Sequence, residues 1–121
     1  MLQTREHEGI LIVHFVEVRL SDDIMIQEIG DQLVELVTTT KLDKVLLNFE
    51  AVKFMGSSMI GKITMLRKTA IDNKKDLRLC QLTENIKEVF GLMKLDALFD
   101  IYENEKEAFT GYELKKKKWY V

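Results

Sequence analysis

The feature that most constrains the fold is a regular change of hydrophobic period along the chain. Residues 9–17, 43–49 and 77–82 are short apolar runs, which are typical of buried strands. Between them, residues 22–37 and 57–71 place apolar side chains at steps of three and four, which predicts two amphipathic helices. Each helix can serve as the crossover between two parallel strands. We therefore predict an α/β fold.

Weaker signals extend this pattern at both ends. Residues 3–7 predict a short edge strand, and residues 98–102 predict a last strand. We expect a mixed, mostly parallel sheet of four to five strands. The helices should pack mainly on one face, and the opening strands should shield part of the other.

Polar residues at the expected helix starts support these boundaries. Ser21 or Asp22 can cap the first helix, and Thr83 can cap a helix that follows the third apolar run. Asn104 and Glu107 have the spacing of a capping box, which predicts a short final helix through Phe109.

The length of the chain indicates a single domain. Its 121 residues can bury one core but not two, and the absence of proline argues against a linker. We predict a domain over residues 1–112 and a basic C-terminal tail over residues 113–121. The tail holds four consecutive lysines followed by Trp119 and Tyr120, a composition that suits a solvated segment or contact with an acidic partner.

Composition also excludes several classes of protein. Eighteen Lys and Arg residues against twenty Asp and Glu residues give a net charge of -2, so nucleic acid is not an expected partner. No apolar run approaches the ~20 residues of a membrane span, and the polar start does not resemble a signal peptide. The single cysteine, Cys80, excludes an internal disulfide and a Cys-rich zinc site. We predict a cytoplasmic protein without a membrane segment.

The sequence lacks the motifs of the common enzyme classes. It contains no Gly-rich phosphate loop, no HExxH, no CxxC and no GxSxG. Of the two histidines, His14 lies inside an apolar strand and His7 is expected at the surface. We predict a non-enzymatic protein with no catalytic residue, no bound metal and no cofactor. A small enzyme of unknown type is supported only by isolated polar residues.

The most specific stretch runs from Asn48 to Gly61 and reads NFEAVKFMGSSMIG. It resembles the phosphorylation-site motif of STAS domains, the fold of the anti-sigma factor antagonists, whose usual form is D-F-S-x-V-x-F-[ML]-D-S-S-G-L-G. The matching residues are Phe49, Val52, Phe54, Met55, Ser57, Ser58 and Gly61, with Ile60 as a conservative replacement. The sequence departs from the motif at Asn48, Glu50, Gly56 and Met59. The resemblance extends over about residues 8–109.

This resemblance implies an anti-sigma factor antagonist. Such a protein would bind an anti-sigma factor of the ATP-binding serine kinase type and so free a sigma factor. The kinase would phosphorylate Ser58, with Ser57 as the second choice, and a serine phosphatase would restore binding. The contact surface is expected to include the following residues: Gly56, Ser57, Met59 and Lys62, with Ser21, Asp22 and Asp23 at its border.

General chemistry leads to the same two serines. A serine at the start of a helix is most often an N-cap, and this role suits Ser57. A helix N-terminus also stabilises added negative charge, so a phosphate on Ser58 would leave the fold intact while changing the surface. Met55 and Met59 flank the serine pair, where exposed apolar groups would suit a partner.

The same resemblance also allows a second function. The altered GSSM core supports a STAS module that is never phosphorylated. Such a module would act as a scaffold, as an oligomerisation unit in contact with further copies of this chain, or as a sensor of a small ligand.

Overall fold

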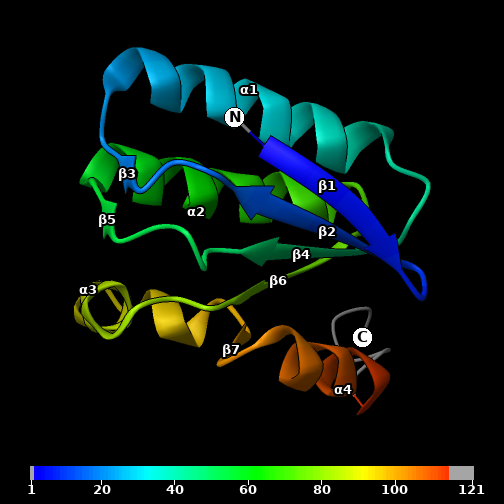
Figure 1. The fold of residues 1–121 in the computed structure, drawn as a ribbon. Coiled ribbons are helices and arrows are strands. Elements are labelled where there is room, and N and C mark those ends of the chain that lie inside the picture. Colours follow the sequence, from blue (N-terminus) through cyan, green and yellow to red (C-terminus); the bar gives the residue numbers. More distant parts are fainter. Residues whose placement is uncertain (1, 115–121) are drawn as a thin grey trace.

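A five-stranded mixed sheet forms the centre of the computed structural model, which describes residues 2–114 (Figure 1). Its strands are β1 (Leu2–His7), β2 (Ile10–Phe15), β4 (Lys44–Asn48), β6 (Asp76–Cys80) and β7 (Ile101–Tyr102). They are ordered β1-β2-β4-β6-β7; β1 pairs antiparallel with β2, and the other neighbours are parallel. The predicted α/β fold with a mostly parallel sheet is confirmed.

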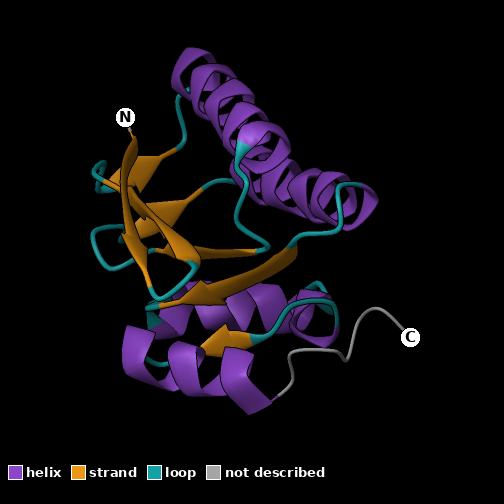
Figure 2. Cartoon of the chain, turned by 90° about the vertical axis from the view of Figure 1, so that its right-hand side faces the viewer, coloured by secondary structure: helices purple, strands orange, loops and turns teal. Residues whose placement is uncertain are grey.

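The helices lie in two layers, one on each side of the sheet. They are α1 (Asp23–Thr39), α2 (Ser57–Asp72), α3 (Glu84–Leu92), the short 3₁₀ turn Leu95–Ala97 and α4 (Glu105–Leu114). Figure 2 shows α1 and α2 together over one face, whereas α4 lies on the opposite side. The two longest helices therefore share one face, as the sequence predicted.

The larger core lies between the sheet and the helices α1, α2 and α3. Apolar residues of β4 and β6 form its floor, and the buried stripes of α1 and α2 pack on them. The core includes the apolar residues of the predicted strands and helices, among them Val45, Leu47, Phe49, Ile63, Leu66 and Leu79. The alternation of apolar residues along each element thus predicted the packing correctly.

The smaller core covers the other face and corrects one expectation. Ile12, Leu46 and Cys80 point toward α4, where Ala108 and Tyr112 cover them. The opening strands do not shield this face, because β1 extends the sheet at its edge instead of folding over it. A helix covers the face instead, because α4 continues past the predicted short helix and adds the Tyr112 ring to its apolar stripe.

Three side chains cap helices as predicted. The Asp22 carboxylate accepts a hydrogen bond from Met25 N at 3.0 Å, and the Thr83 hydroxyl oxygen accepts one from Ile86 N at 3.3 Å. The Asn104 side-chain oxygen accepts one from Glu107 N at 2.9 Å. These bonds satisfy amide groups that have no partner inside their own helix.

Two expected boundaries differ from the structure. The strand predicted over residues 98–102 is reduced to Ile101–Tyr102, because the 3₁₀ turn Leu95–Ala97 precedes it. The final helix continues through Tyr112, whose apolar ring is buried, and ends at Leu114. The lysine run and the two aromatic residues of the predicted tail lie outside the described residues, and the predicted domain boundary at residue 112 stays a prediction.

Candidate switch site

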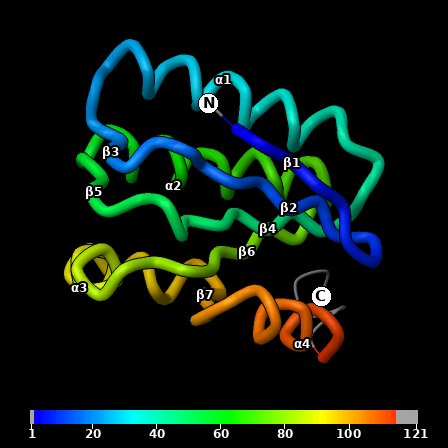
Figure 3. Tube along the Cα trace, viewed as in Figure 1, coloured from blue at the N-terminus to red at the C-terminus, as the bar shows by residue number. Residues whose placement is uncertain are grey.

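A two-stranded parallel ribbon brings the starts of α1 and α2 together. It consists of β3 (Arg19–Leu20) and β5 (Phe54–Met55), and Gly56 N donates to the Leu20 carbonyl oxygen at 2.9 Å. Each strand is followed closely by a helix, so both helices begin at the same end of the molecule (Figure 3). The motif residues and the loop around Ser21 therefore form one surface.

Ser57 and Ser58 are the first two residues of α2, and both are exposed. The N-cap position belongs to Gly56, whose backbone is extended with φ -77° and ψ 165°. The expectation that Ser57 caps the helix is therefore wrong, because Ser57 already lies inside the helix and no side chain makes a capping bond. The first-turn amide groups of α2 consequently lack a side-chain acceptor. This leaves an unneutralised helix N-terminus beside two exposed hydroxyl groups.

Gly56 occupies the position where the motif usually has an acidic residue. A Cβ atom built there would lie 3.7 Å from the Leu20 carbonyl oxygen and 3.7 Å from the Cα and Cβ atoms of Ser21. These are ordinary contact distances, and the φ angle is one that any residue adopts. The fold would thus accept an acidic residue at this position, and the glycine is not required by crowding.

The two methionines that flank the serines are buried, which corrects their expected exposure. Met55 is 7% exposed and Met59 is 0% exposed, and both belong to the larger core. Met59 lies on the sheet-facing side of α2, so its side chain cannot touch a partner in this conformation. Alternation along β5 explains the burial of Met55. Neighbouring strand residues face opposite sides, so Phe54 is exposed and Met55 is buried.

Other apolar groups are exposed at this end of the molecule, and the sequence analysis did not predict them as contact residues. The Arg19 guanidinium lies over the Phe54 ring, with 4.3 Å from its Cζ atom to the ring centroid. Val18 and Ile24 are 55% and 74% exposed. Strand alternation in the ribbon could have identified Phe54, but the pairing of β3 with β5 is a long-range contact that the local pattern does not contain.

The remaining predicted contact residues gather at the same end. Ser21, Asp22 and Asp23 are exposed, although Asp22 is also used as the cap of α1. Lys62 lies one turn after Ser58, and its Nζ atom donates to the Gln27 side-chain oxygen at 3.2 Å. Apart from Met59, the structure therefore places every predicted contact residue at or next to the starts of the two helices.

A separate polar cluster stabilises the opposite face. Arg78 is 1% exposed, and its Nε and Nη2 atoms each donate to the Asp76 carboxylate at 2.8 Å. Its Nη1 atom donates to the Tyr102 hydroxyl at 2.8 Å, and its Cζ atom lies 4.4 Å from the centroid of the Tyr112 ring. Burial opposes the charge of Arg78, but the adjacent carboxylate holds its pKa above the ordinary value. The cluster links β6 to its neighbouring strand β7 and to the helix α4 that covers this face of the sheet.

Cys80 and His14 carry side chains of a type that often reacts or binds metals. Burial raises the pKa of the Cys80 thiol to about 12, so the thiol stays protonated at neutral pH and acts as a small core residue. His14 lies half-buried with its Nε2 atom 3.5 Å from a Glu105 carboxylate oxygen and 3.3 Å from Arg5 Nε. Within residues 2–114, no group of three His, Cys, Asp or Glu side chains is arranged to hold a metal ion.

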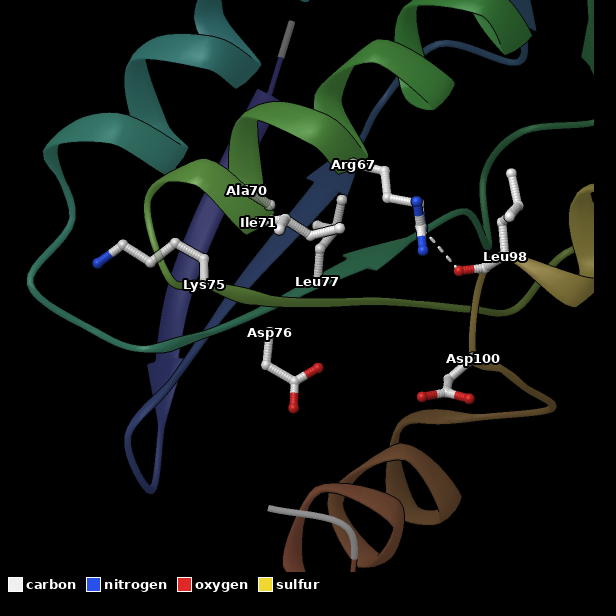
Figure 4. Close-up of a pocket in the computed structure, with 8 residues that line it drawn as sticks. All are labelled: Arg67, Ala70, Ile71, Lys75, Asp76, Leu77, Leu98 and Asp100. Carbon is white, nitrogen blue, oxygen red and sulfur yellow. Dashed lines mark hydrogen bonds between the residues drawn. The ribbon is translucent and has the colours of Figure 1, made fainter. Parts of the chain in front are cut away.

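A small hollow between α2 and β6 is separate from the serine pair at the start of α2. Figure 4 shows Arg67 extending from α2 toward Leu98, where its Nε atom donates to the carbonyl oxygen at 2.9 Å. The side chains of Asp76 and Asp100 point away from Arg67, so charged groups do not converge on the hollow.

Over the described part of the chain, no helix is both long enough and apolar enough to cross a membrane.

The sequence matches the STAS domain family over residues 1–108, and the chain therefore belongs to this family. An anti-sigma factor antagonist STAS domain protein from Planctomyces limnophilus has a similar fold. It shows 19% identity, a TM-score of 0.78, and coverage of 91% of this chain and 96% of the other.

Two further solved structures share this fold. A putative anti-sigma factor antagonist from Thermotoga maritima shows 16% identity and a TM-score of 0.79, over 91% of this chain and 92% of the other. The Bacillus cell fate determinant SpoIIAA, solved in its phosphorylated form, shows 17% identity and a TM-score of 0.68, over 91% and 97%. These likenesses support the fold assignment.

Proposed function

We propose that this chain is an anti-sigma factor antagonist that binds an anti-sigma factor of the ATP-binding serine kinase type and is switched by phosphorylation of Ser58. In this role the chain performs no catalysis and acts only by binding. The observation that carries the proposal is the exposed Ser57–Ser58 pair at the uncapped start of α2, inside the matched motif. A serine phosphatase would reverse the modification.

The position of Ser58 allows a phosphate to change the surface without unfolding the domain. A phosphoserine carries roughly -1.5 to -2 charges at neutral pH. The amide groups of the first turn of α2 and the positive end of its dipole would stabilise this charge. The phosphate would lie at the same end of the molecule as Phe54 and Ile24, so a partner packed on these apolar groups would have to desolvate it or leave.

Ser58 is favoured over Ser57 because it matches the second serine of the motif. Both hydroxyl groups belong to exposed residues, so accessibility does not decide between them. The SpoIIAA structure in its phosphorylated form supports the use of such a switch on this fold, as a property of that protein. The two serines differ by one helical position, about 100° around the axis, and would direct a phosphate to different parts of the surface.

The test uses the purified chain with ATP and a candidate serine kinase. We expect phosphate on Ser58 by peptide mass mapping, and loss of partner capture after modification. Ser58→Ala should retain partner binding but resist phosphorylation, whereas the matched control Ser57→Ala should still be modified. Ser58→Asp should keep its circular dichroism spectrum and bind the partner more weakly. Phosphate only on Ser57, or unchanged binding by Ser58→Asp, would contradict the assignment.

The unphosphorylated module is the second candidate, and Gly56 is the observation that favours it. The structure accommodates a side chain there, so the missing acidic group is a departure of this sequence and not a steric necessity. A kinase that recognises the acidic residue would bind this chain less well. Absence of phosphate with every candidate kinase, together with phosphorylation of a Gly56→Asp variant, would support this second function.

A further inference from the structure

An open hollow of about 550 Å³ lies on one flank of α4, on the side of the sheet opposite α1 and α2 (Figure 2). Tyr102 of β7, the last strand of the sheet, forms part of its wall. Asn104 and Lys106 lie at the end where the helix begins. The other lining residues share one face of α4 because they recur at steps of three and four: Glu107, Thr110, Gly111 and Leu114.

The floor of the hollow is fixed by contacts inside the domain. A Cβ atom built on Gly111 would overlap the Tyr102 side chain, so glycine is needed for the ring to lie this close to α4. The Tyr102 hydroxyl accepts a hydrogen bond from Arg78 Nη1 at 2.8 Å, which holds the ring in place. Leu114 adds an apolar rim and is 78% exposed. The hollow is therefore preformed, and more of its surface is apolar than polar.

The chain around the hollow is acidic. Residues 103–114 contain four glutamates and a single basic residue, Lys106. Two of the glutamates are bonded to basic side chains of other elements, but within residues 2–114 Glu107 and Glu113 form no ion pair. The last turn of α4 also lacks a basic residue, which would complement the negative end of the helix dipole. A basic segment would therefore be attracted to this flank, most strongly where α4 ends.

The segment that follows α4 has the charge and the apolar groups that suit this hollow. Residues 115–121 lie outside the described part of the chain, and they consist of four lysines, Trp119, Tyr120 and Val121. The segment starts next to Leu114, which lines the hollow. Its seven residues span roughly 23 to 25 Å when extended, whereas the ten positions from Leu114 back to Asn104 span about 15 Å of helix. The segment is therefore long enough to turn back and cover the whole hollow.

We propose that residues 115–121 fold back along α4 and place the Trp119 ring in the hollow, against Tyr102. The four lysines then lie beside Glu113 and the negative end of the helix, and the aromatic residues reach toward Asn104. This direction keeps the lysines away from Lys106, which lies at the other end of the hollow. The contact covers the exposed Leu114 and the edge of the sheet at β7.

The occupant is the segment of the same copy, because it is joined directly to the rim of the hollow. Such a short connection gives an effective local concentration of about millimolar or higher. The corresponding segment of a second copy would compete only at a similar protein concentration. The contact uses the outer flank of α4, whose buried face already packs on the sheet, so the domain folds without it.

The experiment measures the fluorescence of Trp119 in the full chain, in which it is the single tryptophan. We expect emission at a shorter wavelength, and slower quenching by acrylamide, than from the same chain unfolded in urea. The reason is that the docked ring is shielded from water. Both properties should stay constant from about 1 µM to about 100 µM protein, since the contact forms within one chain.

Two variants remove the two kinds of contact. Leu114→Ser takes away the apolar rim, and Glu107→Lys makes an acidic wall residue basic. Each should shift the emission of the folded protein toward that of the unfolded chain. The matched controls Met65→Ser and Glu28→Lys change exposed residues of α2 and α1, on the other side of the sheet, and should leave the emission unchanged. Circular dichroism checks that every variant folds.

Emission and quenching equal to those of the unfolded chain would overturn the proposal. Shielding of Trp119 that appears only as the protein concentration rises would also overturn it, since the segment would then bind a second copy. Shielding that both Leu114→Ser and Glu107→Lys leave unchanged would mean that the ring lies elsewhere. No kinase or anti-sigma factor is present in these measurements, so the outcome is independent of whether Ser58 is phosphorylated.

Discussion

Replacing Arg78 by methionine should strongly destabilise the domain. The residue is 1% exposed, and it is the partner of an Asp76 side chain that is itself only 11% exposed. Methionine is a flexible, unbranched side chain that can fill much of the space, but it donates no hydrogen bond. The variant therefore leaves a nearly buried carboxylate without its bidentate partner, and the Tyr102 hydroxyl without its donor.

The contacts set the size of the expected effect. Removing one partner of a buried ion pair costs about 3 to 5 kcal/mol, because the remaining charge stays desolvated. For a domain of this size, such a loss lowers the melting temperature by roughly 10 to 20 °C. Changing Asp76 to asparagine in the same chain removes the uncompensated charge. The double variant should then recover at least about 1 kcal/mol relative to Arg78→Met alone.

Urea unfolding followed by far-ultraviolet circular dichroism measures this difference. The control is Lys68→Met, which breaks an ion pair with Asp72 whose side chains are 80% and 61% exposed. Such exposed pairs contribute less than about 1 kcal/mol, so this variant should unfold near the parent midpoint. A loss below about 1 kcal/mol for Arg78→Met would refute the reasoning, since it would mean that the guanidinium is not needed to hold Asp76.

Other predictions follow from single sites. Leu47→Ala should lower the free energy of unfolding by about 2 to 5 kcal/mol, because this residue is completely buried in β4, and urea denaturation measures the loss. The Cys80 thiol, whose pKa is raised to about 12, should resist thiol reagents at pH 8 until the chain is unfolded; rapid labelling of the native protein would contradict this. Burial raises the pKa of Glu105, but hydrogen bonds from Arg5 and Asn48 outweigh it and hold the pKa below its usual value. The contribution of Glu105 to the free energy of unfolding should therefore be present above about pH 4.3, the pKa of an unfolded glutamate, and be lost as the pH falls through its lower pKa in the folded state. Glu105→Gln should reduce the acid dependence of the melting temperature, which thermal unfolding at several pH values measures. Truncation after Leu114 should preserve cooperative thermal unfolding, because the lysine run is too polar to join the core.

The elements of the larger core could be predicted because each has a clear hydrophobic period. The apolar runs of β4 and β6 alternate with the stripes of α1 and α2, and their packing partners follow from the order of elements along the chain. The position of α4 on the other face of the sheet was harder to predict from the sequence. Its stripe is short, and Tyr112 is anchored by a hydrogen bond from its hydroxyl to the Val45 carbonyl oxygen at 2.6 Å, a contact between residues far apart in sequence.

At the site, the sequence located the serines but not the exposure of their neighbours. Met55 and Met59 are apolar residues next to a loop, and the local pattern allows either burial or exposure. The pairing of β5 with β3 determines that Met55 is buried, because it turns this side chain into the core and leaves Phe54 under the Arg19 guanidinium. A register defined by two strands that are far apart in the sequence cannot be obtained from either strand alone.

Because Met59 is buried and Phe54 is exposed, only Phe54 of the two is free to contact a partner that binds at the start of α2. The buried Met59 contributes to the stability of the domain, so changing it would alter folding and binding together. Phe54 is 43% exposed and contributes area without belonging to the core, so Phe54→Ala separates the two effects. A partner that uses this end of the molecule should therefore depend on Phe54 and on the exposed hydroxyl of Ser58. Both residues lie close to the extended Gly56, one on each side of it, and a phosphate can thus act on the apolar contact without any movement of the sheet.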